Sequence, residues 1–193
     1  MWNKLSVRQF IQLYDIETNT NLHLIEKQVK MLSVIEGKDE SEYDSVKYMK
    51  LLELLHDKTS FFDNIPETKP VDIIEVNGRK YKFVHEINKL TAGQFIDISH
   101  WGGNLMELHN AVACFMLPIK NGKVQKYGSI EHGVIAEDML DARFVDVHGC
   151  LVFFYHVLIE FTNLTLNSLN LKAENQKMLM SLARDGVGLH QLN

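Results

Sequence analysis

Cysteine is scarce in this sequence, and its two cysteines, Cys114 and Cys150, both lie within apolar segments. They do not form a C-x-x-C pair, so the sequence predicts neither a disulfide framework nor a zinc site. We expect two buried free thiols. Proline is also rare, with three residues in 193, and low-complexity tracts are absent. A largely disordered chain is therefore excluded.

A basic excess is missing as well, because 20 lysines and arginines stand against 25 acidic residues and the formal net charge is −5. Binding to phosphate groups requires a basic surface, so we expect no direct contact with nucleic acid. The segment Met1–Leu5 lacks the pattern of a signal peptide, which predicts no export by that route. The most apolar window, Cys150–Ile159, is too short to span a bilayer, so we expect no membrane partner. We interpret it as a buried helix, with a strand as the alternative.

Catalytic motifs are absent. No G-x-S-x-G, P-loop or dinucleotide fingerprint occurs, and none of the nine histidines stands at a recognised metal-ligand spacing. Asp138 and Asp141 are interpreted as solvated helix charges. We expect no metal, no cofactor and no enzymatic activity. The alternative is a small enzyme in which Cys114 and His109 act as nucleophile and base, which requires a tertiary contact between them.

One internal similarity is present, because residues 5–13 and 90–98 both read L-[ST]-x-x-Q-F-I-[QD]-[LI]. Each copy has the chemistry of a helix start: a hydroxyl residue as N-cap, a glutamine three positions later that reaches back to the cap, and a flanking hydrophobic staple. The matching residues are Ser6 and Thr91, Gln9 and Gln94, and the pairs Leu5/Phe10 and Leu90/Phe95. We favour two helices that begin alike over a duplicated binding module.

Residues 1–60 are predicted to form an N-terminal helical unit. After the first capped helix, an apolar stripe at helical spacing ends at Gly37, which can close a helix, and a further stripe continues to about residue 60. Residues 61–70 contain two of the three prolines and no periodic pattern, so they are the predicted linker.

Residues 71–186 are predicted to form the main domain. Asn77-Gly78 separates two strand-like segments and suits a type I′ turn, so the sequence predicts a β-hairpin over 71–84. The second Asn-Gly, at 121–122, predicts an exposed turn or a small hairpin. Residues 187–193 are a tail without a core of its own.

The remainder of the main domain reads as helices. The expected helices begin at Thr91, run along an apolar stripe from Leu105 to Met116 that Pro118 stops, and then cover about 134–140, 142–166 and 173–183. The fold class expected from these elements is α+β and predominantly α-helical.

Large aromatic residues near element ends are the candidate interface. Trp2, Phe61, Phe62 and Trp101 stand at such places or in the predicted linker, where exposed aromatics often anchor contacts between proteins. Local packing over a domain seam is the alternative. The hairpin edge at 71–76 is a further candidate, because an uncovered edge strand can pair with another chain.

Several stretches resemble small proteins of tailed bacteriophages, in particular crAss-like phages of Bacteroides-type gut bacteria. They are Leu5–Leu13, Val76–Val84, Leu90–Ile98 and Asn104–Ala113, and the likeness extends from Leu5 to about Phe154. The shared patterns are helix starts, a hairpin and core stripes, so no functional residue can be transferred from the family.

The resemblance implies a non-enzymatic virion protein made in the bacterial cytoplasm: a head–tail connector, a tail component or an internal cargo protein. Its partners would be other virion proteins, such as portal, connector or tail components, and it would be a homo-oligomer or present in several copies. An assembly chaperone that binds the tape-measure protein is the alternative.

Overall fold

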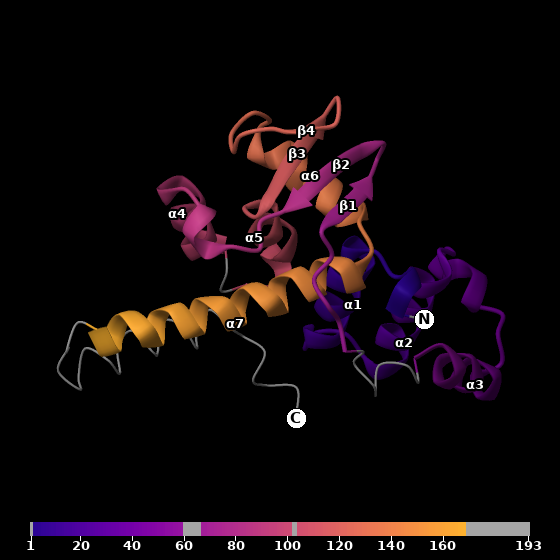
Figure 1. Ribbon diagram of the computed structural model, residues 1–193. Coiled ribbons are helices and arrows are strands. Elements are labelled where there is room, and N and C mark those ends of the chain that lie inside the picture. The colour runs from indigo at the N-terminus through magenta and orange to yellow at the C-terminus, as the bar shows by residue number, and fades with distance from the viewer. Residues whose placement is uncertain (1, 60–66, 102–103, 169–193) are drawn as a thin grey trace. The chain divides into compact units, whose positions relative to one another are not determined.

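The computed structural model describes residues 2–59, 67–101 and 104–168 (Figure 1). The chain divides into two compact units. The first contains Met1–Glu67 and Arg143–Val145, and the second contains Thr68–Ala142 and the chain from Asp146 on. Helices predominate, and a small antiparallel sheet accompanies them. The predicted α+β, mainly helical class is confirmed. Of the predicted linker, residues 61–66 lie outside the described residues.

The first unit consists of α1 (Val7–Thr18), α2 (Leu24–Glu36) and α3 (Tyr48–Thr59), with the 3-10 turns η1 (Trp2–Lys4) and η2 (Glu40–Tyr43). Gly37 ends α2 with a φ of 65°, as predicted, because this left-handed conformation has no steric cost for glycine. Leu32, Tyr43 and Leu51 form a buried cluster in this unit. The helical part of the unit therefore has an apolar core of its own.

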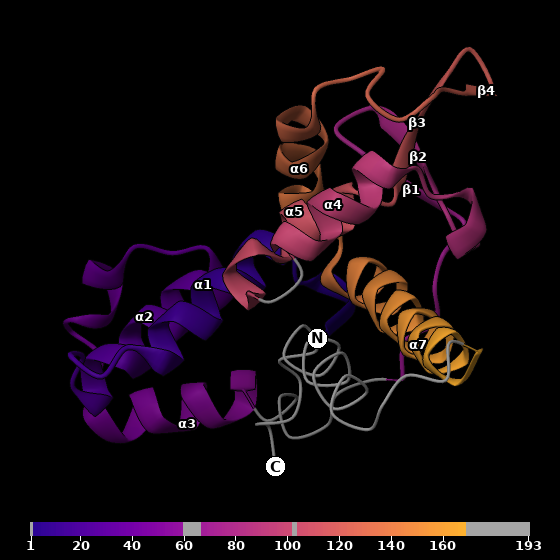
Figure 2. The same ribbon diagram turned by 90° about the vertical axis from the view of Figure 1, so that its left-hand side faces the viewer.

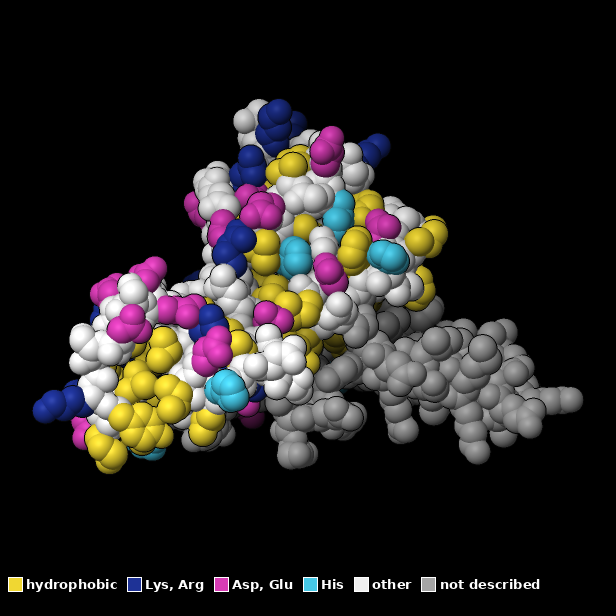
Figure 3. All heavy atoms as spheres, turned by 180° about the vertical axis from the view of Figure 1, so that it is seen from behind, with side chains coloured by type: hydrophobic (Ala, Val, Ile, Leu, Met, Phe, Trp, Pro, Cys, Tyr) yellow, Lys and Arg dark blue, Asp and Glu magenta, His cyan; other side chains and the backbone are white. Residues whose placement is uncertain are grey.

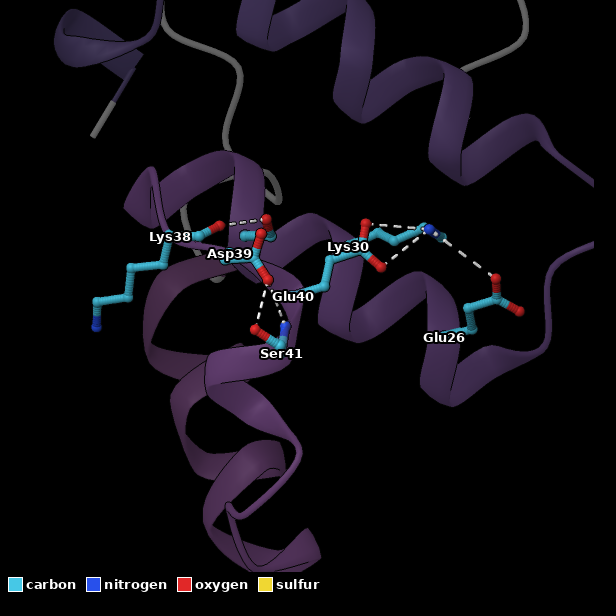
Figure 4. Close-up of polar contacts among 7 residues, drawn as sticks. Glu26, Lys30, Lys38, Asp39, Glu40 and Ser41 are labelled. Carbon is cyan, nitrogen blue, oxygen red and sulfur yellow. Dashed lines mark hydrogen bonds and ion pairs between the residues drawn. The ribbon is translucent and has the colours of Figure 1, made fainter.

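Polar contacts attach η2 to α2 (Figure 4). The Lys30 ammonium contacts both carboxylate oxygens of Glu40 at 3.0 Å and lies 4.0 Å from Glu26. Asp39 caps η2 by accepting from the Ser41 backbone N–H at 2.9 Å. The acidic segment that follows α2 is thus held by charge pairing in addition to the buried Tyr43.

Glu36 connects the end of α2 to α3. Its carboxylate contacts Lys38 at 2.7 Å and Lys58 at 3.1 Å, and accepts the Tyr43 hydroxyl at 3.1 Å. These donors, with Lys38 as the largest contribution, lower the pKa of Glu36 to about 2. Protonation of Glu36 in acid would remove this connection.

Residues 143–145 belong to the first unit although they lie far from it in the sequence. Arg143 forms a β-bridge with Ser6, and the Phe144 N–H donates to the Leu5 carbonyl at 2.8 Å. The Phe144 ring is 3% exposed and stacks on Phe10 with a centroid distance of 4.0 Å. The start of α1 is therefore covered by Arg143, which forms the bridge, and by Phe144, the first residue of helix α7 (Phe144–Ser168).

The second unit contains a four-stranded antiparallel sheet in the order β1-β2-β3-β4. The strands are β1 (Ile73–Val76), β2 (Arg79–Phe83), β3 (Met116–Lys120) and β4 (Lys123–Val124). The predicted hairpin at Asn77-Gly78 is confirmed, and the second Asn-Gly forms the smaller β3–β4 hairpin. Both turns have φ angles of 50° at asparagine and 72° at glycine, as a type I′ turn requires.

The prediction that a helix continues to Met116 is wrong. The helix α5 covers only Leu108–Ala113, and Met116–Lys120 is strand β3, with Pro118 paired opposite Tyr81. The Pro118 nitrogen faces β4, where its carbonyl accepts from the Gln125 N–H at 2.7 Å. Proline cannot return a second bond there, which explains why β4 has only two residues.

Four α-helices complete the described part of the second unit: α4 (Ala92–Trp101), α5, α6 (His132–Asp141) and α7 (Phe144–Ser168), of which the first two residues belong to the first unit. The 3-10 turns η4 (Ile87–Lys89) and η5 (Leu105–Glu107) accompany them. The helical interpretation of residues 150–159 is confirmed within α7. Figure 2 shows α5 and α6 side by side, next to the strands. The helix predicted at 173–183 and the tail 187–193 lie outside the described residues.

Asp138 is buried, contrary to its interpretation as a solvated charge. It is 4% exposed on α6 and accepts from Arg79 at 2.8 Å, from Asn77 at 3.1 Å and from the Tyr81 hydroxyl. Burial opposes ionisation, but these donors outweigh it and lower the pKa of Asp138. The carboxylate attaches the β1–β2 hairpin to α6, which sequence spacing does not indicate because the partners are far apart in the chain.

The chain enters the second unit in close contact with α7. A Cβ built at Gly149 would lie 2.3 Å from the Lys69 carbonyl oxygen, so only glycine allows this approach. One residue earlier in each segment, Thr68 Oγ1 and His148 Nδ1 are 2.8 Å apart. The segment before β1 is thereby positioned along α7.

Candidate functional site

The two copies of the repeated element begin helices in the same way. In the first copy (residues 5–13), the Gln9 N–H donates to Ser6 Oγ at 3.1 Å and the Ser6 N–H donates to Gln9 Oε1 at 3.1 Å. In the second copy (residues 90–98), the corresponding bonds between Gln94 and Thr91 are 3.2 and 3.0 Å. The predicted capping boxes at α1 and α4 are both confirmed.

Each capping glutamine also makes a bond that the sequence does not indicate. Gln9 Nε2 donates to the Val34 carbonyl at 3.0 Å, and Gln94 Nε2 donates to the Cys114 carbonyl at 2.7 Å. Gln94 is 2% exposed, so its amide is a buried tie between α4 and the end of α5. The repeat therefore encodes both a cap and a long-range connection.

The outer sides of the two copies differ. Phe10 is half-buried and stacks on Phe144, whereas the matching Phe95 is 41% exposed and Ile96 is 68% exposed. No ring contact of Phe95 occurs within the described part of the chain. The staple expected for the second copy therefore leaves much of the Phe95 side chain in solvent.

We refer to the exposed side of α4 as the α4 face. It has no Asp, Glu, Lys or Arg, because Asp97, the one such residue of α4, is half-buried and accepts the Tyr127 hydroxyl at 2.6 Å. The residues of the α4 face are Ala92, Gly93, Phe95, Ile96, Ser99 and His100. Apolar residues presented without charge are typical of the centre of a protein contact.

The aromatic residues predicted as the interface lie in different surroundings. The Trp2 ring stacks on Phe144 with a centroid distance of 5.4 Å. Trp101, the last residue of α4, packs at 4.4 Å from the His100 ring and stacks at 6.3 Å on His132. Both tryptophans are half-buried. Phe61 and Phe62 lie outside the described residues.

Hydrophobic side chains also gather on the surface of the first unit, with acidic side chains beside them (Figure 3). The exposed large apolar residues of this unit are Leu24, Ile25, Tyr48 and Met49, and Leu24 and Met49 are the most exposed, at 68% and 69%. They lie at the starts of α2 and α3. A surface of this kind is a second candidate for a protein contact.

Strand β1 is one edge of the sheet, as a pairing role for 71–76 requires. It has four residues, and Ile73 is 49% exposed. On the same face, Glu75 forms an ion pair with Lys80 at 3.1 Å. Short, charged edge strands are those that proteins use to avoid unwanted pairing.

The thiols lack the surroundings of a nucleophile. Cys114 and Cys150 are both fully buried, and burial raises the pKa of each thiol to about 12, with Asp97 raising that of Cys114 further. Cys114 Sγ donates to the Asn110 carbonyl at 3.4 Å. An activated cysteine requires a positive environment and a lowered pKa, so this geometry does not favour covalent catalysis.

His132 has an unusual environment at the start of α6. Both ring nitrogens are buried and have no hydrogen-bond partner among the described residues. Burial lowers the pKa of His132, and Asp97 opposes the shift. Buried polar atoms are normally satisfied, so the neutral ring destabilises this position.

Among the residues whose side chains the structure describes, no three His, Cys, Asp or Glu side chains are grouped as metal ligands. None of the described helices combines the length and the apolar character that crossing a membrane requires. Comparison of the chain with known protein families, with curated proteins and with solved structures gives no match.

Proposed function

We propose that this chain is a non-enzymatic virion protein of a tailed phage, a connector, tail or internal component that acts through contacts with other virion proteins. The sequence resemblance to crAss-like phage proteins motivates the assignment. It would be made in the bacterial cytoplasm, assemble in several copies and reside in the particle.

The observation that carries the proposal is the α4 face. Phe95 and Ile96 project from a helix whose start is fixed by a capping box and whose inner side is tied by the buried Gln94. A rigid, uncharged apolar surface loses little conformational entropy on binding, so it favours association with another protein. The buried, protonated thiols give no comparable support to the Cys/His enzyme.

A chaperone for the tape-measure protein is the second candidate. The exposed apolar residues of the first unit, with acidic side chains beside them, would suit an amphipathic partner helix (Figure 3). Such a protein would bind during assembly and leave before the particle is complete. The two candidates therefore differ in where the chain is found after assembly.

Quantitative mass spectrometry of purified particles separates them. A virion component is expected at a fixed copy number per particle, so its abundance relative to the portal protein should be constant between preparations. Abundance in infected cells combined with absence from particles would contradict the proposal and favour the chaperone. Loss of infectivity in both Cys114→Ala and His109→Ala, with normal particle composition, would favour the enzyme.

A further inference from the structure

The two copies of the repeated element differ at three matching positions, all on the outer side. At the cap, Ser6 is bridged to Arg143, whereas Thr91 is exposed. One residue earlier, the Leu5 carbonyl accepts the Phe144 N–H, whereas the Leu90 carbonyl has no backbone donor among the described residues. The third difference is the aromatic residue, covered at position 10 and exposed at position 95.

All three contacts of the first copy come from one short segment. Residues 143 and 144 run antiparallel to residues 5 and 6, so one backbone bond places the Phe144 ring over Phe10. Because the capping boxes of the two copies match, the second copy offers the same acceptor, the same helix start and the same phenylalanine in the same relative positions. Among the described residues, no segment makes the corresponding contacts with the second copy.

We infer that the second copy is a docking site for a short segment of a partner protein in which an aromatic residue follows an extended residue and begins a helix. The segment would donate a backbone N–H to the Leu90 carbonyl and stack its aromatic ring on Phe95, as residues 143–144 do on the first copy. Ile96 would be covered by the residues that follow. This inference rests on the proposed role in protein contacts and specifies the chemistry of the partner.

The absence of charge on the α4 face limits the occupant further. A partner side chain that stacks on Phe95 would meet no Asp, Glu, Lys or Arg on this face, so an apolar aromatic ring is favoured over a charged side chain. A backbone bond combined with one aromatic anchor requires only a few consecutive residues, so a short linear segment of a partner is sufficient.

The chain supplies its own probe for the test. We would use a synthetic peptide of residues 140–147 in which a benzophenone replaces the ring of Phe144, and irradiate it with the purified full-length protein. The first copy is occupied by the chain's own segment, so crosslinks are expected on residues 90–100. A scrambled peptide with the same photoreactive group is the control.

Variants make the test decisive. Phe95→Asp and Ile96→Asp should each reduce crosslinking about tenfold or more, since an anchor is lost. Val124→Asp introduces the same charge at another exposed apolar residue and should have no effect. Circular dichroism would confirm that all three variants fold. Equal labelling by the scrambled peptide, labelling away from α4, or labelling that Phe95→Asp leaves intact would overturn the inference. Detection of the chain in particles tests the proposed function separately.

Discussion

In the first copy of the repeated element the phenylalanine ring packs 4.0 Å from Phe144, whereas in the second copy the same residue type is 41% exposed. On the inner side the order is reversed, because Gln94 is almost completely buried and Gln9 is only half-buried. One sequence pattern thus fixes a helix start in both units. The surroundings decide whether the glutamine or the phenylalanine is the more buried residue of the copy. The difference indicates that the first copy is closed and structural, and that the second is open and available.

The largest expected difference in the free energy of unfolding is between variants of the two capping glutamines. Gln94→Ala should lower the free energy of unfolding by about 2–4 kcal/mol, because it removes the capping bond and leaves the buried Cys114 carbonyl without a donor. Gln9→Ala should cost only about 1–2 kcal/mol, since solvent can reach the Val34 carbonyl more easily. Urea unfolding of the two variants measures the difference. Equal losses would show that burial does not distinguish the two glutamines.

For the two phenylalanines, the loss of stability should be larger in the first copy than in the second. Phe10→Ala should cost about 2 kcal/mol, because it removes a stacked, half-buried ring from the Phe144 contact. Phe95→Ala should cost less than about 1 kcal/mol, since much of this ring is already in solvent. Thermal unfolding of the pair provides the measurement. A greater loss for Phe95→Ala would mean that the second copy is covered in the free chain.

The caps should behave alike. Ser6→Ala and Thr91→Ala each remove one side-chain bond to the third helical N–H, so each should cost about 1 kcal/mol. Glycine at either position should cost less than alanine, because it is a better N-cap. If one of the alanine variants left the free energy of unfolding unchanged, the shared sequence would not stabilise the two helix starts in the same way.

The smallest expected effect is a change in stability with pH. It concerns the second copy, in which Asp97 stands at the position that the neutral Gln12 occupies in the first copy. Burial lowers the pKa of His132 below its ordinary value of 6.5 in the folded state, so the unfolded chain takes up this proton first. The free energy of unfolding is therefore independent of this group above pH 6.5 and decreases as the pH falls below that value. His132→Phe should flatten this part of the stability curve.

The buried His148 has a pKa shifted in the same direction, so part of the acid loss should persist in His132→Phe. Chemical unfolding at a series of pH values between neutral and mildly acidic would check both statements. An unchanged pH dependence in His132→Phe would show that His132 is hydrated in the folded protein.

The local parts of the fold could be predicted from the sequence because their causes lie within a few residues. The caps at Ser6 and Thr91, the end of α2 at Gly37 and the two Asn-Gly turns each depend on neighbours in the chain. Strand β3 was missed for the opposite reason. Its apolar residues continue a helical stripe, and only pairing with β2 makes Pro118 acceptable in a strand.

The candidate site was accessible to sequence reasoning only in part. The repeat located the site, but the sequence does not indicate that Phe95 is 41% exposed, because no local pattern shows that residues 143–145 contact the first copy and not the second. Asp138 is a similar case, since its three donors lie on the β1–β2 hairpin. Hydrogen-bond partners that lie far apart in the sequence form no recognisable spacing pattern.

Hydroxyl-radical footprinting of Phe10 and Phe95 is the most direct test of the difference between the two copies. In the free chain, oxidation of Phe95 should exceed that of Phe10, because only Phe95 is substantially exposed. In purified particles the Phe95 signal should fall while the Phe10 signal stays low. Equal oxidation of the two residues in the free chain, or a Phe95 signal that particles leave unchanged, would contradict the account.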